Sequence, residues 1–451
     1  MLKSPSRSSG ERSKDMIQSR LPAAILVLCF LIVLVSVAIA SDQEPDKSYS
    51  GNWLNRSTLT GDWEGMRNDL VRKGITLDLK FTQVLQGVVN GGKDSSWESG
   101  GRGNLLFSVD TQKLGLWPGG FLTIEVEGNY GESVNTYTGA LLPVDYNRVN
   151  PAPQKERIAV PAVQYAQFLS HYLGLYVGKI DTTSGDMNEF AHGKGDEQFM
   201  NLAFNLNPTL IMVIPYSALG AGVILLPTQD PKAAIINLGV VSANAEAYNA
   251  GFDSLNSDSM SLFAEGRLRT NFFGLTGHQL LGGIYSNKNH TSLDQRLVPL
   301  FAGDIEEKTD SWSVYYNFDQ YLYEIKKGSG RGIGLFGRFG ISDGNPSPVH
   351  HFYSMGIGGK GMVDRRPDDR FGIGWYYADI TNPTLAGPLA TRSFLRNERG
   401  VEVYYTVAIT PWALLTPDIQ IVRPAQEKRS SQDSEDVDTN TILALRLQLL
   451  F

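Results

Sequence analysis

The chain has 451 residues, of which 42% are hydrophobic, 10% aromatic and 19% charged, with 47 glycines. It carries too many aromatics for a disordered protein and too few charges for an ordinary soluble domain. Its formal net charge of −7 argues against a nucleic acid as partner, because nucleic acids attract basic surfaces.

The first 40 residues predict a cleaved secretory signal peptide. A basic segment, 1–20, precedes an apolar run, 21–40, that ends in Ala38-Ile39-Ala40. A transmembrane anchor is the alternative, because 20 apolar residues can span a bilayer. Cleavage would remove the single cysteine, Cys29, and leave 35 basic against 45 acidic residues, a net charge of −10. An exported protein without disulfides must gain its stability elsewhere.

The start of the mature chain predicts a polar lead-in, residues 41–58, and then one short helix within 59–74. Thr60 or Asp62 is expected to cap this helix, and Gly74 to end it. From residue 75 onward the sequence alternates apolar and polar residues with period two, which predicts β-strands. The expected strands are 75–87, 102–111, 119–129, 159–169, 171–180, 209–217, 219–227, 232–242, 260–270, 276–287, 311–323, 331–341, 352–360, 371–380, 400–410, 413–423 and 441–451.

Two architectures bury such a sheet: a soluble β-sandwich, and a membrane barrel with apolar residues outside and polar residues in the lumen. The last segment, 441–451, favours the barrel, because its alternating leucines lead to Phe451 without a polar tail. In lipid the last strand must pair with the first so that no edge stays open. We therefore predict an all-β protein, a transmembrane antiparallel β-barrel of about 16 strands. Leu443 to Phe451 would face lipid, Arg446 and Gln448 would face the channel, and Phe451 would be an assembly signal.

Five segments together resemble carbohydrate-selective porins of the OprB type. They are LTGDWEGMRNDLVRKGITLDLKFTQ (59–83), GNLLFSVDTQKLGLWPGGFLTI (103–124), LYVGKIDTTSGDMNEFAHGKGDEQFMNLAF (175–204), DGNPSPVHHFYSMGIGGKGMVDRRPDDRFGIGWYY (343–377) and RGVEVYYTVAITPWALLTPDIQIVRP (399–424).

The resemblance runs from about residue 52 to residue 451. Glu64, where the family has Gly, and Ile421, where it often has an aromatic, depart from its pattern. The resemblance implies a sixteen-stranded barrel over 59–451 in the bacterial outer membrane, through which sugars, usually glucose-type monosaccharides, diffuse passively. It also implies carbohydrate solutes, outer-membrane lipid and lipopolysaccharide, and the barrel assembly machinery as partners. It leaves open whether the barrel is a monomer or a homotrimer.

The polar faces of the first hairpin supply the candidate residues of a pore constriction: Arg102, Asn104, Glu125 and Glu127, with Trp97 folded inward as a stacking platform. Charged side chains suit sugar hydroxyls and aromatic faces suit the C–H faces of the ring, while binding must stay weak for flux. Solvation of the lumen or ion pairing across it is an equally favoured role for these charges. Lumen solvation or ion pairing is favoured over a role in selectivity for four further residues of the polar face: Glu265, Arg267, Arg269 and Arg338.

Other functions find little support in the sequence. GIGGKG (356–361) lacks the Walker spacing, and no G-x-S-x-G elbow is present, so we expect no enzyme and no cofactor. His350 and His351 beside Asp364, Asp368 and Asp369 lack ligand spacing, so we expect a loop there and no metal. The alternatives left open are a general diffusion or ion porin, a secreted all-β sugar-binding protein, and an outer-membrane hydrolase.

Overall fold

The computed structural model describes residues 49–151, 158–184, 187–228, 230–245, 247–252, 259–295, 305–385, 394–428 and 435–451. The predicted signal peptide and the first part of the polar lead-in lie outside the described residues. No helix in the described part of the chain is long and apolar enough to cross a membrane.

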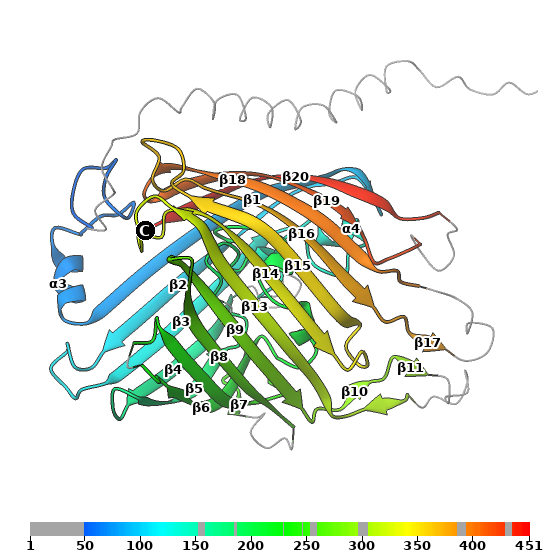
Figure 1. The fold of residues 1–451 in the computed structure, drawn as a ribbon, viewed down its shortest axis with the longest axis horizontal. Coiled ribbons are helices and arrows are strands. Elements are labelled where there is room, and N and C mark those ends of the chain that lie inside the picture. Colours follow the sequence, from blue (N-terminus) through cyan, green and yellow to red (C-terminus); the bar gives the residue numbers. More distant parts are fainter. Residues whose placement is uncertain are drawn as a thin grey trace, which may run out of the picture. The chain divides into compact units, whose positions relative to one another are not determined.

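Sixteen antiparallel strands form one closed barrel (Figure 1), which confirms the predicted fold class. The barrel strands are β1 (Ile75–Gly92), β2 (Trp97–Asp110), β3 (Gly120–Gly131), β4 (Ile158–Phe168), β5 (Leu173–Asp181), β6 (Ser217–Leu225), β7 (Ala234–Ser242), β8 (Met260–Phe272), β9 (Leu275–Ser286), β13 (Ser311–Glu324), β14 (Gly332–Ser342), β15 (Val349–Lys360), β16 (Arg370–Ile380), β18 (Glu398–Thr410), β19 (Ala413–Arg423) and β20 (Asp438–Leu450). Four two-residue strands pair outside the barrel: β10 (His290–Thr291) with β12 (Glu307–Lys308), and β11 (Asp294–Gln295) with β17 (Thr384–Leu385).

The last strand closes the barrel, as its alternation predicts. β20 pairs with β19 on one side and with β1 on the other, where Lys80 lies opposite Leu450. The pairing extends to the final residue, since the backbone N–H of Phe451 donates to the carbonyl of Leu79 at 2.8 Å. Every barrel strand therefore has two neighbours, and no edge of the barrel sheet is left for lipid to meet.

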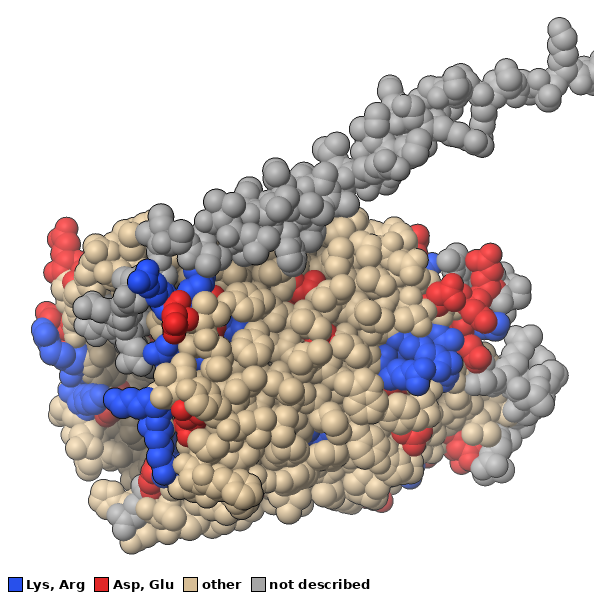
Figure 2. Space-filling view, turned by 45° about the horizontal axis from the view of Figure 1, so that its top comes forward, with Lys and Arg blue, Asp and Glu red and all other residues tan. Residues whose placement is uncertain are grey.

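The alternation also places the apolar side chains of the strands outside. On β20, Arg446 and Gln448 are buried on the lumen side, while Leu445 and Leu447, which alternate with them, are partly exposed on the outer face. On the face shown in Figure 2, the charged side chains gather toward two ends, and few of them lie on the wall between. A wall of this kind suits the hydrocarbon region of a bilayer.

The two ends of the barrel differ in their connections. At one end, which we call the turn end, neighbouring strands are joined by short segments such as 273–274 and 411–412. Helix α3 (Met66–Arg72) and the last residue lie at this end (Figure 1). The opposite end, the loop end, carries the long connections 132–157, 182–216, 243–259, 287–310 and 381–397.

Helix α3 confirms a helix in 59–74 but not its predicted start. It begins after Gly65, whose φ of 92° lies in the left-handed region, and no side chain caps it. Trp63 and Glu64 also have positive φ, so the chain turns sharply before the helix. Neither Thr60 nor Asp62 is its N-cap; the backbone carbonyl of Asp62 instead accepts from two N–H groups at the turn.

The predicted strand at 209–217 is wrong, and only Ser217 belongs to a strand. Residues 202–204 and 208–210 form short 3-10 helices, η3 and η4, whose N-caps are Asn201 and Asn207. Both asparagine side chains accept from the helix backbone, and Pro208 has no N–H for a strand ladder. This apolar run is therefore buried inside the barrel and does not cross the membrane.

Two connections from the loop end fold into the lumen. The large inner loop, 182–216, packs Phe199 and Phe204 against the barrel side chains Tyr376 and Tyr404, with ring centroids of Phe199 and Tyr404 4.8 Å apart. The small inner loop, 132–157, is described as far as residue 151, and this part contains α4 (Asn135–Thr138) and η2 (Tyr146–Arg148) and buries apolar side chains against β1, β19 and β20. The protein therefore has its hydrophobic core inside the barrel, along one wall.

Candidate functional site

Two carboxylates on β18 fasten the two inner loops to the wall. Glu402 accepts hydrogen bonds from the backbone N–H groups of Met200 and Asn201 in the large inner loop. Glu398 accepts from the N–H groups of Leu141 and Leu142 in the small inner loop, at 2.6 and 3.2 Å. Both glutamates are fully buried, at 1% and 0% exposed. Their four bonds fix the depth at which the loops enter the lumen.

Two arginines on different strands of the wall, β14 and β20, hold the large inner loop by its carbonyl groups. Arg446 donates to the carbonyls of Gly195 and Gln198 at 2.6 and 2.9 Å, and Arg338 donates to that of Ala191. The prediction that Arg446 lines the channel therefore needs correction. It faces the lumen, but the large inner loop covers it, leaving it 1% exposed.

A row of alternating charges, which we call the ion-pair chain, links the large inner loop to five barrel strands, β1, β2, β3, β5 and β16. Its members in spatial order are Asp181, Lys194, Glu127, Arg102, Asp196, Lys80, Glu197 and Arg370.

The contacts along this chain are direct. Lys194 pairs with Asp181 and, at 3.2 Å, with Glu127. Arg102 lies 2.7 Å from Asp196 and 3.8 Å from Glu127.

Beyond Asp196, the chain continues through Lys80, whose Nζ lies 3.4 Å from both Asp196 and Glu197. Glu197 is also 3.0 Å from Arg370 of β16. Because Asp196 and Glu197 lie between cations of the barrel wall, the tip of the large inner loop is held from two sides.

Burial divides the ion-pair chain into two parts. Arg102, Glu127 and Asp196 are at most 3% exposed and serve as the anchor of the large inner loop. Lys80, Glu197 and Arg370 keep 24–30% of their side-chain surface exposed. These outer members offer both signs of charge to a solute in the lumen.

The loop residues of the chain remain charged at neutral pH. Burial raises the pKa of Asp196, but Arg102 and then Lys80 lower it by more, so it lies below its ordinary value. The ammonium group of Lys80 is the largest cause that lowers the pKa of Glu197. Burial opposes the charge of Lys194, yet Asp181 and Glu127 raise its pKa above the ordinary value.

The structure brings together four of the five residues predicted for the constriction. In the β2–β3 hairpin Asn104 lies opposite Glu127, and its amide donates to Glu125 at 2.6 Å and to Glu127 at 3.0 Å. Arg102 joins them through Glu127. Asn104 and Glu125 are partly exposed, whereas Arg102 and Glu127 are covered by the loop.

Trp97 does not join this group. Along β2, Trp97 lies an odd number of residues from Arg102 and Asn104 and so points to the other face of the sheet. Its ring lies over Gly87 of β1. A side chain at Gly87 would come within 2.3 Å of that ring. Because adjacent residues of a strand point to opposite faces, Trp97 covers the outer face and is no stacking platform in the lumen.

A cavity of about 220 Å³ lies beside the ion-pair chain, between the large inner loop and the opposite wall. Its lining combines aromatic side chains with polar ones: Tyr176, Phe263 and Tyr315, and Gln164, Asp181, Asn237 and Glu265. Tyr176 donates to Asn237 at 2.8 Å, and Tyr315 donates to Glu265 at 2.7 Å. Aromatic faces and fixed amide and carboxylate oxygens together suit a small polyhydroxylated solute.

Sequence reasoning did not single out most of this site. Five of its members lie in segments that carry the family resemblance, but no local sequence pattern sets them apart from their neighbours. They are Lys80, Lys194, Asp196, Glu197 and Arg370. Asp196 lies 94 residues from Arg102, and Glu402 lies 202 residues from Met200. A signal did exist in the apolar run 199–214, which three asparagines interrupt, the last of them directly before Pro208.

Comparisons with known proteins agree with this architecture. The model of the family described as carbohydrate-selective porin, OprB family, matches residues 96–451. The porin AaxA of Chlamydia trachomatis is 24% identical over 279 residues, 60% of this chain and 52% of that protein. Porin B of Pseudomonas aeruginosa is 22% identical over 201 residues, 39% of this chain and 42% of that protein. The chain thus spans about half the length of the curated relatives it matches.

Solved structures share the fold. The high-pH structure of Pseudomonas putida OprB superposes with a TM-score of 0.74 at 20% identity, over 89% of this chain and 100% of that one. The low-pH structure of the same protein gives a TM-score of 0.54 at 17% identity, over 88% and 98%. At these identities the likeness concerns the barrel architecture alone.

Proposed function

Because the chain belongs to the OprB family of carbohydrate-selective porins, we propose that it is an outer-membrane channel for the passive diffusion of carbohydrates, with glucose-type monosaccharides as its solutes. The family and the named relatives are porins, which are channels and not enzymes. The same proposal includes export of the protein with a cleaved signal peptide. It also includes insertion by the barrel assembly machinery into the lipid and lipopolysaccharide of the outer membrane.

The observation that carries the proposal is the composition of the narrowed lumen. The inner loops occupy part of the lumen, and we expect the remaining passage to run along the exposed members of the ion-pair chain and the aromatic and polar cavity. Charged groups replace water around sugar hydroxyls, and the rings of Phe263 and Tyr315 offer flat faces to the C–H groups. None of these contacts is strong by itself, which is what rapid passage of a solute requires.

The cavity size supports a small sugar. About 220 Å³ is ample for one pyranose ring but leaves little space for a long oligosaccharide. The preferred sugar would then be set by the spacing between Asn237, Glu265 and the aromatic rings. A monosaccharide should thus enter this cavity more readily than a longer chain.

Planar-bilayer conductance with added sugar tests the proposal. Glucose should lower the KCl current of the single channel in a concentration-dependent way, and Phe263→Ala should reduce that effect while leaving the current without sugar nearly unchanged. Phe339→Ala is the matched control, because Phe339 stacks on the aromatics Tyr316 and Phe318 outside the cavity. A current insensitive to every sugar would instead support a general diffusion or ion pore, the alternative that the mixed charges of Lys80, Glu197 and Arg370 favour.

A further inference from the structure

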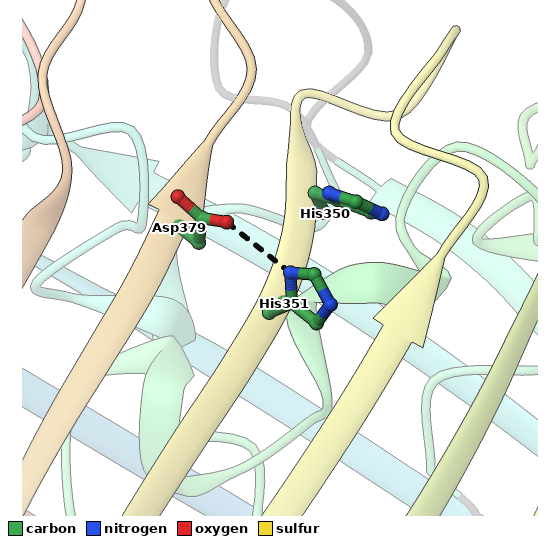
Figure 3. A group of neighbouring side chains, drawn as sticks. All are labelled: His350, His351 and Asp379. Atoms are coloured by element: carbon green, nitrogen blue, oxygen red, sulfur yellow. Dashed lines mark hydrogen bonds and ion pairs between the residues drawn. The ribbon is translucent and has the colours of Figure 1, made fainter.

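The two adjacent histidines, His350 and His351, lie near the loop end of β15 and not in a loop, which corrects the expectation from sequence. The aspartates suggested beside them in the sequence are remote: Asp369 follows the turn at the opposite end of β15 and pairs with Arg366. A different carboxylate, Asp379 of β16, lies directly opposite His351. The group that the fold assembles is His350, His351 and Asp379 (Figure 3).

A β-bulge places two consecutive imidazoles side by side. Neighbouring residues of a regular strand point to opposite faces, but the register of β15 and β16 shifts between Val349 and His351, so His350 is the extra residue. The two ring centroids are 4.0 Å apart, and both rings lie near Asp379 in Figure 3. His351 Nδ1 is 3.2 Å from Asp379 Oδ2.

The bulge is held by neighbouring groups. The carbonyl of Val349 accepts the hydroxyls of Ser342 and Ser347 at 2.8 and 3.2 Å. The N–H of Thr381 donates to Pro348 at 2.7 Å, which joins the ends of the two strands. Backbone support of this kind keeps the side chains oriented before a ligand arrives.

From this arrangement we propose that His350, His351 and Asp379 form a binding site for a divalent transition-metal ion of the zinc class. One nitrogen of each imidazole and one carboxylate oxygen all lie within 4.8 Å of one another. Two imidazoles and one carboxylate are a donor set that zinc accepts, with a fourth position left for water, whereas magnesium and calcium prefer oxygen ligands.

The position of the site indicates what the metal would do. Tyr353 and Tyr377 are the next cross-strand pair on the same face toward the turn end, and both belong to the outward aromatic side chains. Because such aromatics mark the boundary between lipid and water, the histidines lie just beyond it, within reach of solvent. A bound ion would join β15 to β16 at the loop end and stabilise the strands there.

Zinc titration of the full-length barrel, purified in detergent without a polyhistidine tag, tests the site. We expect one saturable site per chain by calorimetry, with His351→Gln and Asp379→Asn each weakening zinc affinity by at least about tenfold, since loss of even an outer-shell partner costs 10–100-fold. Magnesium in excess should not compete. The matched control is His278→Gln, because His278 bonds Asp319 at 2.7 Å in a similar pair without a second imidazole.

A second measurement on the same proteins guards against folding defects. Zinc should raise the temperature at which the wild-type barrel unfolds, measured by its change in gel mobility on heating, and leave that temperature unchanged in His351→Gln. All variants should show the mobility of the folded barrel before heating. The proposal is overturned if no saturable site is found, or if His278→Gln weakens zinc binding as much as the other two substitutions.

Discussion

The buried arginines of the lumen wall contact the large inner loop and are covered from solutes in the channel. Arg102, Arg338 and Arg446 are each at most 3% exposed and bind the large inner loop, two through carbonyls and one through Asp196. We therefore expect a charge in this position to act on solutes indirectly, by holding the loop that fills part of the lumen. Substitutions here should therefore change the width of the passage more than its charge.

Arg102→Ala tests this role. The change leaves the carboxylate of Asp196 buried without its closest cation, which should destabilise the docked loop by about 3–5 kcal/mol. We expect larger and noisier single-channel currents and a weaker block by sugar.

The control for Arg102→Ala is Arg267→Ala, which removes an equal charge from the polar face of β8, outside the ion-pair chain. If both substitutions change only ion selectivity, and by the same amount, Arg102 is not an anchor.

Asp145 gives the small inner loop a dependence on pH. Its side chain is 2% exposed, and one oxygen has no hydrogen-bond partner among the described residues. Burial raises the pKa of this carboxyl to about 7, although Arg148, Arg446 and Arg102 act in the opposite direction. Below that pH the folded chain holds a proton that the unfolded chain releases.

Stability should consequently fall as the pH rises from about 4 to about 7 and then level off, by at most about 4 kcal/mol. Asp145→Asn should remove this part of the pH dependence and be more stable than the wild type at pH 8. Urea unfolding at pH 5 and pH 8 measures both effects, with the exposed Asp94→Asn as control. A wild-type midpoint that does not fall between these pH values would contradict the assignment.

At the scale of the element, β18 is the strand that organises the lumen. Glu398 and Glu402 are four residues apart on one strand, so both point inward, and each receives the backbone N–H groups of a different inner loop. One strand thus sets the positions of two segments that are distant from it and from each other in the sequence.

Glu402→Ala should release the large inner loop, because two buried N–H groups lose their acceptor at about 1–3 kcal/mol each. Glu398→Ala should act on the small inner loop instead. Sugar block at the cavity should therefore decrease more in Glu402→Ala, since that cavity is lined by Leu210 and Ile214 of the large loop. Equal loss of block in both variants, measured in planar bilayers, would show that the loops do not act separately.

The strands could be predicted from the sequence because their signal is local. Alternation from residue 75 onward predicts the strands, the lumen face of Arg446 and the closing strand, whereas the register of the β2–β3 hairpin comes from the structure alone. The inner loops could not be predicted in the same way, because the apolar run at 209–217 is buried inside the barrel and not in lipid. Hydrophobicity alone does not distinguish these two environments, and the β18 glutamates that bind the loops are more than 200 residues away from them.

At the scale of the whole molecule, the strand pairing of the barrel wall does not depend on the large inner loop inside it. The sixteen strands are closed by the pairing of β1 and β20, and none of those ladder bonds involves the large inner loop. The ends of that loop also meet without it, because Asp181 and Ser217 are paired across β5 and β6. The loop therefore adds an internal core to a wall that is already complete, and we expect it to form the constriction of the channel.

Replacing residues 184–214 by a short Gly-Ser connector should then leave a folded barrel with a wider passage. A sixteen-stranded barrel encloses an aqueous channel when nothing fills it, so the single-channel conductance should rise by at least about twofold. Block by sugar should disappear, because the tip of the ion-pair chain and one side of the cavity are removed. The matched control shortens 287–310, whose flanking residues Ser286 and Ser311 are likewise paired and whose Leu293 bonds Asn345 in the β14–β15 connection. Unchanged conductance in the first variant, or an equal rise in the control, would contradict a constriction built by the large inner loop.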